Sequence, residues 1–288
     1  MKDRQAHKRQ SKWHQLVEQI RTHKSSFTLY LILRGLVILT MVMQFLHGNF
    51  ENVFLCILTL FLFIVPSFIE KNFHIQLPDT LETIILLFIF AAEILGEIQA
   101  FYVVFPFWDT MLHTLNGFLA AAIGFCLVDL LNRNGNFSFQ LSPVYMAVVA
   151  FCFSMTIGVL WEFFEFGMDM IFRLDMQKDT VVNVISSVML DPNGGNTPTM
   201  IQGISDVMVN GQSLGLGGYL DIGLFDTMKD LFVNFIGAVV FSVIGFFHVR
   251  SRGKSKFARQ FIPVVPATDE AAPLPAATPD DTGDPAAQ

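Results

Sequence analysis

Four apolar segments of this chain carry acidic, His or Asn side chains at helical spacing, toward the same end of each segment. These side chains are Glu93 and Glu97; Asp109 and His113; Glu162, Glu165 and Asp169; and Asp226, Asp230 and Asn234. An ionisable group inside hydrocarbon costs roughly 2.5–3.5 kcal/mol even on the most lenient scale, so a group of them indicates a functional site. We therefore expect the chemistry of this protein at these positions.

The spacing brings these side chains together on helix faces. Residues at i, i+4 and i+8 of an α-helix lie within about 80° of one another. The two sets with this spacing are Asp109, His113 and Gly117, and Asp226, Asp230 and Asn234. Glu162 lies about ten residues from the outer end of its segment, which places it ~15 Å deep. Such a carboxyl group must be protonated, paired or bound to a metal.

Three interpretations of this cluster stay open. Carboxylates and one imidazole suit a divalent cation such as Mg, Mn, Fe or Zn, and the ligands would be Glu162, His113 and Asp230, with Glu93 as a further candidate. A buried Glu among like charges could instead carry protons for transport or acid/base catalysis. The third interpretation is hydrogen bonding between helices that approach closely at small residues. The candidate catalytic residues are Glu162, Glu165, Asp109, His113, Asp226, Asp230 and Asn234.

The composition indicates a membrane protein. Hydrophobic residues make up 52% of the chain and charged residues 15%, which excludes an ordinary soluble domain. About six runs are long enough to cross ~30 Å of hydrocarbon as helices. They span 27–47, 52–70, 80–100, 109–131, 144–172 and 226–249. We expect an all-α polytopic bundle in the lipid bilayer, without a nucleic-acid partner and without the usual NTPase, hydrolase or dehydrogenase motifs.

Lys and Arg predict the orientation. They are concentrated in residues 1–26 and after the last span, which places both termini in the cytoplasm and the 173–225 loop outside. Residues 1–26 have the pattern of an amphipathic helix or of a solvated basic segment. Residues 251–288 are rich in Pro, Ala and Asp, and we expect a disordered tail. The long loop is a functional lid or a disordered excursion, and its apolar runs favour a lid.

An internal repeat relates the second half of the chain to itself. WDTMLHTLNGFLAAAIGF (108–125) aligns with FDTMKDLFVNFIGAVVFSVIGF (225–246), which pairs His113 with Asp230 and Gly117 with Asn234. The preceding spans each place carboxylates near their outer end. The transmembrane domain (27–250) therefore contains two pseudo-repeated helical hairpins, with a shared site between them.

The residues of this repeat resemble two bacterial families. The stretch GYLDIGLFDTMKDLFVNFIGA resembles the uncharacterised YjdF-like inner-membrane proteins, and the pattern is distantly similar to the VanZ-like family. The VanZ-like pattern is matched by Asp109 and His113, by Glu162 and Glu165, and by Asp230, Asn234, Gly237 and Ala238. Glu165 stands where Gln is usual in that family. The resemblance implies a multi-pass protein of the bacterial inner membrane and no established reaction.

Two classes of function remain at this point. One is an envelope enzyme, metal- or acid/base-dependent, that acts on a lipid-linked or amphiphilic substrate. The other is a proton- or cation-coupled transporter. A site confined to one side favours the enzyme or a binding protein, because a transporter needs a path to the other face. The sequence leaves the substrate, the metal ion and the oligomeric state open.

Overall fold

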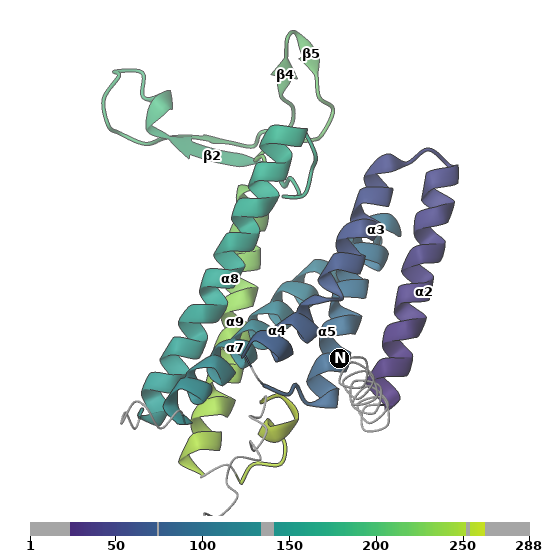
Figure 1. Ribbon diagram of the computed structural model, residues 1–288. Helices are drawn as coiled ribbons and strands as arrows, with labels where there is room; N and C mark the ends of the chain where they lie inside the picture. Colours follow the sequence, from purple (N-terminus) through teal and green to yellow (C-terminus); the bar gives the residue numbers. More distant parts are fainter. Residues whose placement is uncertain (1–23, 74, 134–140, 252–253, 263–288) are drawn as a thin grey trace, which may run out of the picture.

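The computed structural model describes residues 24–73, 75–133, 141–251 and 254–262, and most of these residues are helical (Figure 1). The expected amphipathic segment before residue 24 and the tail from residue 263 lie outside the described residues. The helices are α2 (Lys24–Leu46), α3 (Phe50–Leu62), α4 (Val65–Phe73), α5 (Asp79–Phe90), the π-helix η1 (Ala91–Ile98), α6 (Phe101–Val104), α7 (Trp108–Arg133), α8 (Pro143–Phe172), α9 (Leu224–Arg250) and the short 3₁₀ helices η2 (Val188–Leu190) and η3 (Ala258–Gln260).

Five helical stretches in the described part of the chain are long and apolar enough to cross a membrane. They are Phe27–Leu46, Phe50–Asn72, Trp108–Asp129, Pro143–Phe172 and Leu224–Arg250. The sixth span expected over 80–100 is not among them. That stretch carries several carboxylates, and its α-helical part ends at Phe90, where the π-helix η1 begins. The structure therefore contains a polytopic helical bundle with five spans of this kind, one fewer than the sequence predicted.

The ends of α8 follow from its sequence. Ser142 caps the N-terminus, because its Oγ accepts a hydrogen bond from the Tyr145 backbone N–H at 3.2 Å. Pro143 occupies the first turn, where a missing N–H costs nothing. At the other end Arg173 adopts a left-handed conformation with φ of 60°, which stops the helix. These signals position Glu162 and Glu165 in the half of α8 that is nearer the 173–225 loop.

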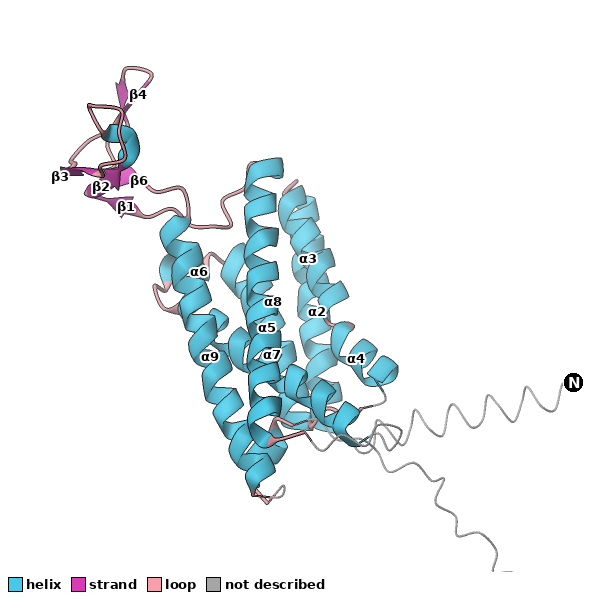
Figure 2. Cartoon of the chain, turned by 90° about the vertical axis from the view of Figure 1, so that its left-hand side faces the viewer, coloured by secondary structure: helices cyan, strands magenta, loops and turns pink. Residues whose placement is uncertain are grey.

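The three C-terminal spans α7, α8 and α9 pack together more extensively than the other helices of the bundle. Contacts between α7 and α9 advance along both helices together, so the two helices run in the same direction. The pairs are Asp109 with Lys229, Gly117 with Asn234, and Phe125 with Gly245. The helix α8 packs against both of them and runs in the opposite direction (Figures 1 and 2). This three-helix unit holds most of the predicted site residues.

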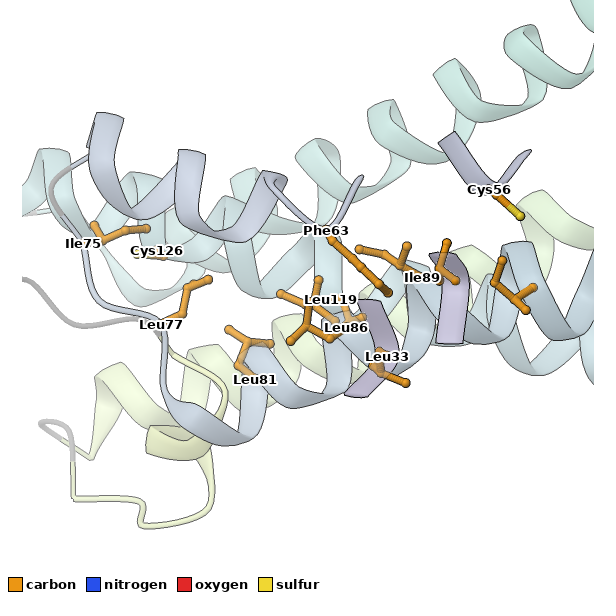
Figure 3. Close-up of a cluster of buried hydrophobic side chains, with 13 residues drawn as sticks. Leu33, Cys56, Phe63, Ile75, Leu77, Leu81, Leu86, Ile89, Leu119 and Cys126 are labelled. Carbon is orange, nitrogen blue, oxygen red and sulfur yellow. The ribbon is translucent and has the colours of Figure 1, made fainter. Parts of the chain in front are cut away.

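The N-terminal helices form a separate apolar contact with α5 and η1. Leu33 of α2, Phe63 after α3 and Leu86 of α5 are among its buried side chains, together with Leu119 of α7 (Figure 3). The side chains in this cluster are aliphatic, aromatic or thiol groups. Helices α2 to α5 therefore support α7 from one side without contributing chemistry there.

The end of the three-helix unit farther from the 173–225 loop contains a second cluster of buried apolar side chains. The ring of Phe241 contacts those of Phe118 and Phe125 edge to face. Residues 254–262 fold back against this end, where Ala258 and Ile262 are buried and Phe261 packs on Phe118. This first part of the expected disordered tail is therefore packed, because Ala258, Phe261 and Ile262 find apolar partners at this end of the helices.

The loop between α8 and α9 contains short antiparallel strands, so the all-α expectation is incomplete. The strands are β1 (Val181–Val182), β2 (Val184–Ser187), β3 (Thr199–Gln202), β4 (Met208–Val209), β5 (Gln212–Ser213) and β6 (Tyr219–Leu220). They pair as β1 with β6, β2 with β3, and β4 with β5. In both views the strands lie near the C-terminal end of α8 and the N-terminal end of α9 (Figures 1 and 2). The part of the loop that reaches the site is the segment immediately after α8, described below.

Candidate functional site

His113 lies among three carboxylates that come from three different helices. Its Nε2 is 3.3 Å from Asp109 Oδ1 on α7 and 3.8 Å from Asp230 Oδ2 on α9. Its Nδ1 is 3.9 Å from Glu162 Oε1 on α8. The i, i+4 spacing of Asp109 and His113 places both on one face of α7, as the sequence predicted. The structure thus brings four of the predicted residues together at one point.

Lys229 completes this cluster on its outer side. Its Nζ is 2.8 Å from Asp109 Oδ2, 3.4 Å from Asp226 Oδ1 and 3.6 Å from Asp230 Oδ1. Each of Asp109 and Asp230 therefore directs one oxygen toward His113 and the other toward Lys229. Sequence reasoning did not select Lys229 as a site residue. Its position next to Asp230, on a helix rich in apolar residues, was the available signal.

Exposure decreases from the outer to the inner side of the cluster. The side chain of Lys229 is 44% exposed, that of His113 is 11% exposed, and that of Asp230 is 1% exposed. Two buried oxygens, Glu162 Oε2 and Asp230 Oδ1, have no hydrogen-bond partner among the described residues. Asp230 Oδ1 lies 3.6 Å from Lys229 Nζ, beyond hydrogen-bond distance, so these two carboxylates are buried with fewer donors than buried carboxylates usually have.

Glu165 is buried next to this cluster but interacts with its own helix. Its Oε1 accepts a hydrogen bond of 2.8 Å from Trp161 Nε1, four residues earlier on α8. One turn of helix therefore orients both side chains. Glu165 is therefore held by Trp161, and no ion pair among the described residues joins Glu165 to His113.

Asp226 and Asp169 hold the segment 175–180, which we call the strap. Asp169 accepts hydrogen bonds from the backbone N–H groups of Met176 and Gln177, at 2.6 and 2.8 Å. Asp226 Oδ2 accepts one from the Lys178 N–H at 2.8 Å. The strap thus crosses from the end of α8 to the start of α9. Asp226 has two contacts, the strap through Oδ2 and Lys229 through Oδ1.

Asn234 connects helices and lies outside the carboxylate cluster. Its Oδ1 accepts a hydrogen bond of 3.0 Å from Asn116 Nδ2 on α7, and its Nδ2 lies 3.7 Å from Met155 Sδ on α8. Gly117 and Gly158 leave the space that Asn234 fills. The catalytic role that the sequence suggested for Asn234 has no geometric support, because both ends of its amide group are used in helix packing.

Glu93 and Glu97 lie on the π-helix η1, and the ion pairs of His113 among the described residues do not include them. Glu93 is buried, yet it does not belong to the group of potential metal ligands that the described residues form, which contains Asp109, His113 and Asp230. The Ala91 carbonyl accepts a hydrogen bond of 3.2 Å from Trp108 Nε1. A π-helix is a common feature of functional sites and rotates the side chains that follow it. This rotation could not be predicted from α-helical spacing.

These features define a polytopic integral membrane protein in which three spans enclose a polar site near one end. The chain belongs to the family described as "Predicted membrane protein (DUF2238)", whose model matches residues 28–251. It is also similar to an uncharacterized protein of Thermotoga maritima, with 27% identity over 128 residues, which is 43% of this chain and 64% of that protein. The match thus covers less than two thirds of that relative. No solved structure matches the chain.

Proposed function

We propose that this protein is a membrane enzyme in which His113 and its carboxylates perform acid/base chemistry on the polar head group of an amphiphilic substrate. The observation that carries the proposal is the position of His113 between Asp109, Glu162 and Asp230, where two buried carboxylate oxygens have no hydrogen-bond donor in the described part of the chain. An imidazole is the side chain best suited to proton transfer near neutral pH, and flanking carboxylates orient it.

An amphiphilic substrate is favoured by the surroundings of the site. The cluster opens toward the outer ends of the helices, where Lys229 is exposed. Large apolar side chains on the same stretches of α8 and α9 are also exposed, among them Phe163 and Phe232. A molecule with a polar head and acyl chains could therefore contact both surfaces at once. In this proposal Lys229 binds an anionic head group and His113 transfers the proton.

The closed inner end favours an enzyme over a transporter. Below the cluster the described residues of the three-helix unit pack mostly apolar side chains, including Phe125, Ala150 and Phe241, and the buried polar side chains there, Ser154, Asn234 and Ser242, are uncharged. A proton or cation pathway needs polar side chains or water along its length. An enzyme that works from one face needs no such path.

We further infer the finer features of the membrane arrangement. A sixth span formed by α5 and η1, with both termini in the cytoplasm of a bacterium, is supported by the distribution of Lys and Arg. Repeated hairpins are supported by the parallel contact of α7 and α9, since Gly117 lies against Asn234 and His113 beside Asp230. These are the pairs that the sequence alignment matched. A distant relation to the VanZ-like pattern rests on the same residues.

The test is a search for lipid conversion. Purified wild-type protein and the His113→Gln variant would be reconstituted in vesicles of bacterial polar lipid extract and incubated from pH 5 to 9, with mass spectrometry of the lipids before and after. We expect a lipid species to decrease with the wild type and to persist with His113→Gln. Asp129→Asn, which removes a carboxylate from the inner end of α7, should behave as wild type. Equal lipid profiles for wild type and His113→Gln at every pH would overturn the proposal.

A further inference from the structure

We propose that Asp109 Oδ1, His113 Nε2 and Asp230 Oδ2 bind one divalent metal ion. This inference rests on the proposed function, in that the ion would be the cofactor of the same site, and it changes one role. With Nε2 on the ion and Nδ1 facing Glu162, His113 would hold the ion, and water bound to the ion would take part in the proton transfer in its place. The three residues offer one ligand atom each, and these atoms lie within 4.8 Å of one another. They come from α7 and α9, whose relative position is set by packing outside the cluster.

The distances fit ligands of a common ion better than they fit hydrogen bonds. A hydrogen bond from an imidazole N–H to a carboxylate is about 2.7–3.2 Å long. The distances from Nε2 are 3.3 Å to Asp109 and 3.8 Å to Asp230, and the one from Nδ1 to Glu162 is 3.9 Å. Two ligands about 2.1 Å from a tetrahedral or octahedral metal are about 3.0–3.4 Å apart. Asp109 and His113 have this separation, and Asp230 needs a small shift.

The burial of the carboxylates around the three ligand atoms is a second indication of a cation, although the two oxygens without a hydrogen-bond donor, Glu162 Oε2 and Asp230 Oδ1, are not themselves the proposed ligands. Asp230 is 1% exposed and Glu162 is 4% exposed, and each has a buried oxygen without a hydrogen-bond partner among the described residues. Leaving a carboxylate buried without donors costs several kcal/mol, so such groups are paired or bound to metal. Lys229 Nζ lies 3.6 Å from Asp230 Oδ1, and it donates a hydrogen bond to Asp109 Oδ2 at 2.8 Å. The one ammonium group of Lys229 is therefore too far from Asp230 Oδ1 for a hydrogen bond, and no ion pair joins it to Glu162 among the described residues.

The surroundings of His113 correspond to those of a metal-bound histidine. Such a histidine directs its second ring nitrogen toward a carboxylate or carbonyl, which fixes the tautomer that ligates the metal. Glu162 occupies this place, since its Oε1 faces Nδ1. Without an ion, the Nε2 lone pair of that tautomer would face two carboxylate oxygens and be repelled. The geometry thus assigns Asp109, His113 and Asp230 to the metal and Glu162 to the orientation of the imidazole.

The ligand set narrows the choice of ion. One imidazole and two carboxylates are typical of Zn²⁺, Mn²⁺ or Fe²⁺, whereas sites for Mg²⁺ and Ca²⁺ use oxygen ligands alone. Three protein ligands leave a coordination position for water or substrate, as in catalytic metal sites. The exposed side of the cluster at Lys229 is where a substrate would reach that position.

The competing explanation is that Lys229 is itself the cation of the site. The two explanations predict opposite effects of Lys229→Met. If a metal ion binds, removing the neighbouring ammonium reduces repulsion and affinity should increase severalfold. If Lys229 is the only cation, the variant leaves the carboxylates without a counterion, and metal should be absent from wild type in the first place.

The experiment measures metal content without reference to activity. Full-length protein in nanodiscs would be stripped with a chelator, exposed to Zn²⁺ or Mn²⁺, separated by gel filtration and examined by mass spectrometry for bound metal. We expect about one ion per wild-type chain, less than a tenth of that for His113→Gln and Asp230→Asn, and roughly 10–100-fold weaker binding for Glu162→Gln. Asp129→Asn, on the same helix as two of the ligands, should bind like wild type.

Folding of each variant would be checked by its gel-filtration profile before metal is measured. Equal metal content in wild type and in monodisperse His113→Gln and Asp230→Asn, whether zero or one, overturns the metal site. The result is separable from the proposed function. Lipid conversion by metal-free protein would contradict only the metal, whereas a stoichiometric ion without lipid conversion would contradict only the enzyme.

Discussion

Gly117 of α7 lies directly against the backbone of Asn234 on α9, such that a Cβ at Gly117 would be 2.0 Å from the Asn234 carbonyl oxygen. Gly237 has the same relation to Thr114, with a Cβ at 2.0 Å from the Thr114 carbonyl oxygen. These two glycines let α7 and α9 approach closely enough for His113 to reach Asp230. The first prediction follows from this contact.

Gly117→Ala should destabilise the bundle by about 3 kcal/mol, because the added methyl group meets backbone that cannot move aside. The measurement is thermal unfolding in detergent, followed by loss of the monodisperse gel-filtration peak. Gly167→Ala is the matched control, since nothing lies within 4 Å of a Cβ there on α8. This variant should gain stability by up to about 1 kcal/mol through helix propensity. Equal melting of the two variants would contradict the close contact.

Ile222 is in a left-handed conformation, with φ of 53°, immediately before α9. This conformation costs an L-residue about 1–2 kcal/mol, and β-branched side chains tolerate it least. The side chain is 81% exposed, so its removal sacrifices little packing. Ile222→Gly should therefore stabilise the protein by about 1 kcal/mol. Ile222→Val retains the backbone strain, so its thermal unfolding temperature should equal that of wild type. Stabilisation by Val as well as by Gly would indicate a cause other than the backbone conformation.

Asp221 should make the base of the loop sensitive to acid. Partial burial raises the pKa of Asp221, but hydrogen bonds from the N–H groups of Thr180, Gly223 and Phe225 outweigh it, so the pKa lies below its usual value. A carboxylate with a lowered pKa stabilises the fold above its unfolded pKa of about 3.9, and this contribution disappears as the pH falls through the folded pKa. The junction of β1 and β6 should thus loosen only in strong acid.

Asp221→Asn removes the same charge at neutral pH and can be tested directly. Hydrogen exchange of peptides covering residues 175–182 at pH 7 should become several times faster than in wild type. Asp179→Asn is the control, because burial and the neighbouring Asp175 and Asp221 raise the pKa of Asp179, so its charge contributes no such stabilisation. Faster exchange in both variants would mean that net charge, not hydrogen bonding, holds the junction.

Asp230 and Asn234 lie one turn apart on α9, are equally buried, and should respond differently to substitution. Asp230→Asn removes one of several neighbouring negative charges, so thermal stability should stay the same or increase while activity is lost. Asn234→Ala leaves the Asn116 amide unpaired and a space between three helices, and should cost roughly 1–3 kcal/mol. Unfolding curves of both variants test this. If the Asp230→Asn protein were destabilised but active, the carboxylate cluster would have a role in helix packing alone.

The orientation can be tested by cysteine labelling in intact cells. In a background with Cys152→Ala, which removes the exposed native thiol while Cys56 and Cys126 stay buried, a cysteine at Ser213 should react with a membrane-impermeant maleimide. A cysteine at Ser251 should react only after the cells are permeabilised. The reverse pattern would place the site on the cytoplasmic face.

The sequence alone was sufficient to predict the helical membrane protein and the faces of its helices. Apolar runs longer than a bilayer crossing and a spacing of four residues depend only on local geometry. Asp109 and His113 therefore share a face in the structure, as do Asp226 and Asp230. The same argument could not predict that η1 is a π-helix. The helix changes from α to π at Ala91, whose carbonyl accepts a hydrogen bond from the distant Trp108 side chain.

The tertiary structure decided which polar residues form the site. Periodicity defines directions around one helix axis, but the offset and rotation of two helices depend on how their surfaces pack. The contacts at Gly117 and Gly237 set that offset between α7 and α9, and thereby bring Asp230 and Lys229 to His113 and Asp109. Asn234 is directed into helix packing and Asp226 to the strap for the same reason. Equivalent spacing in the sequence thus leads to different surroundings in the fold.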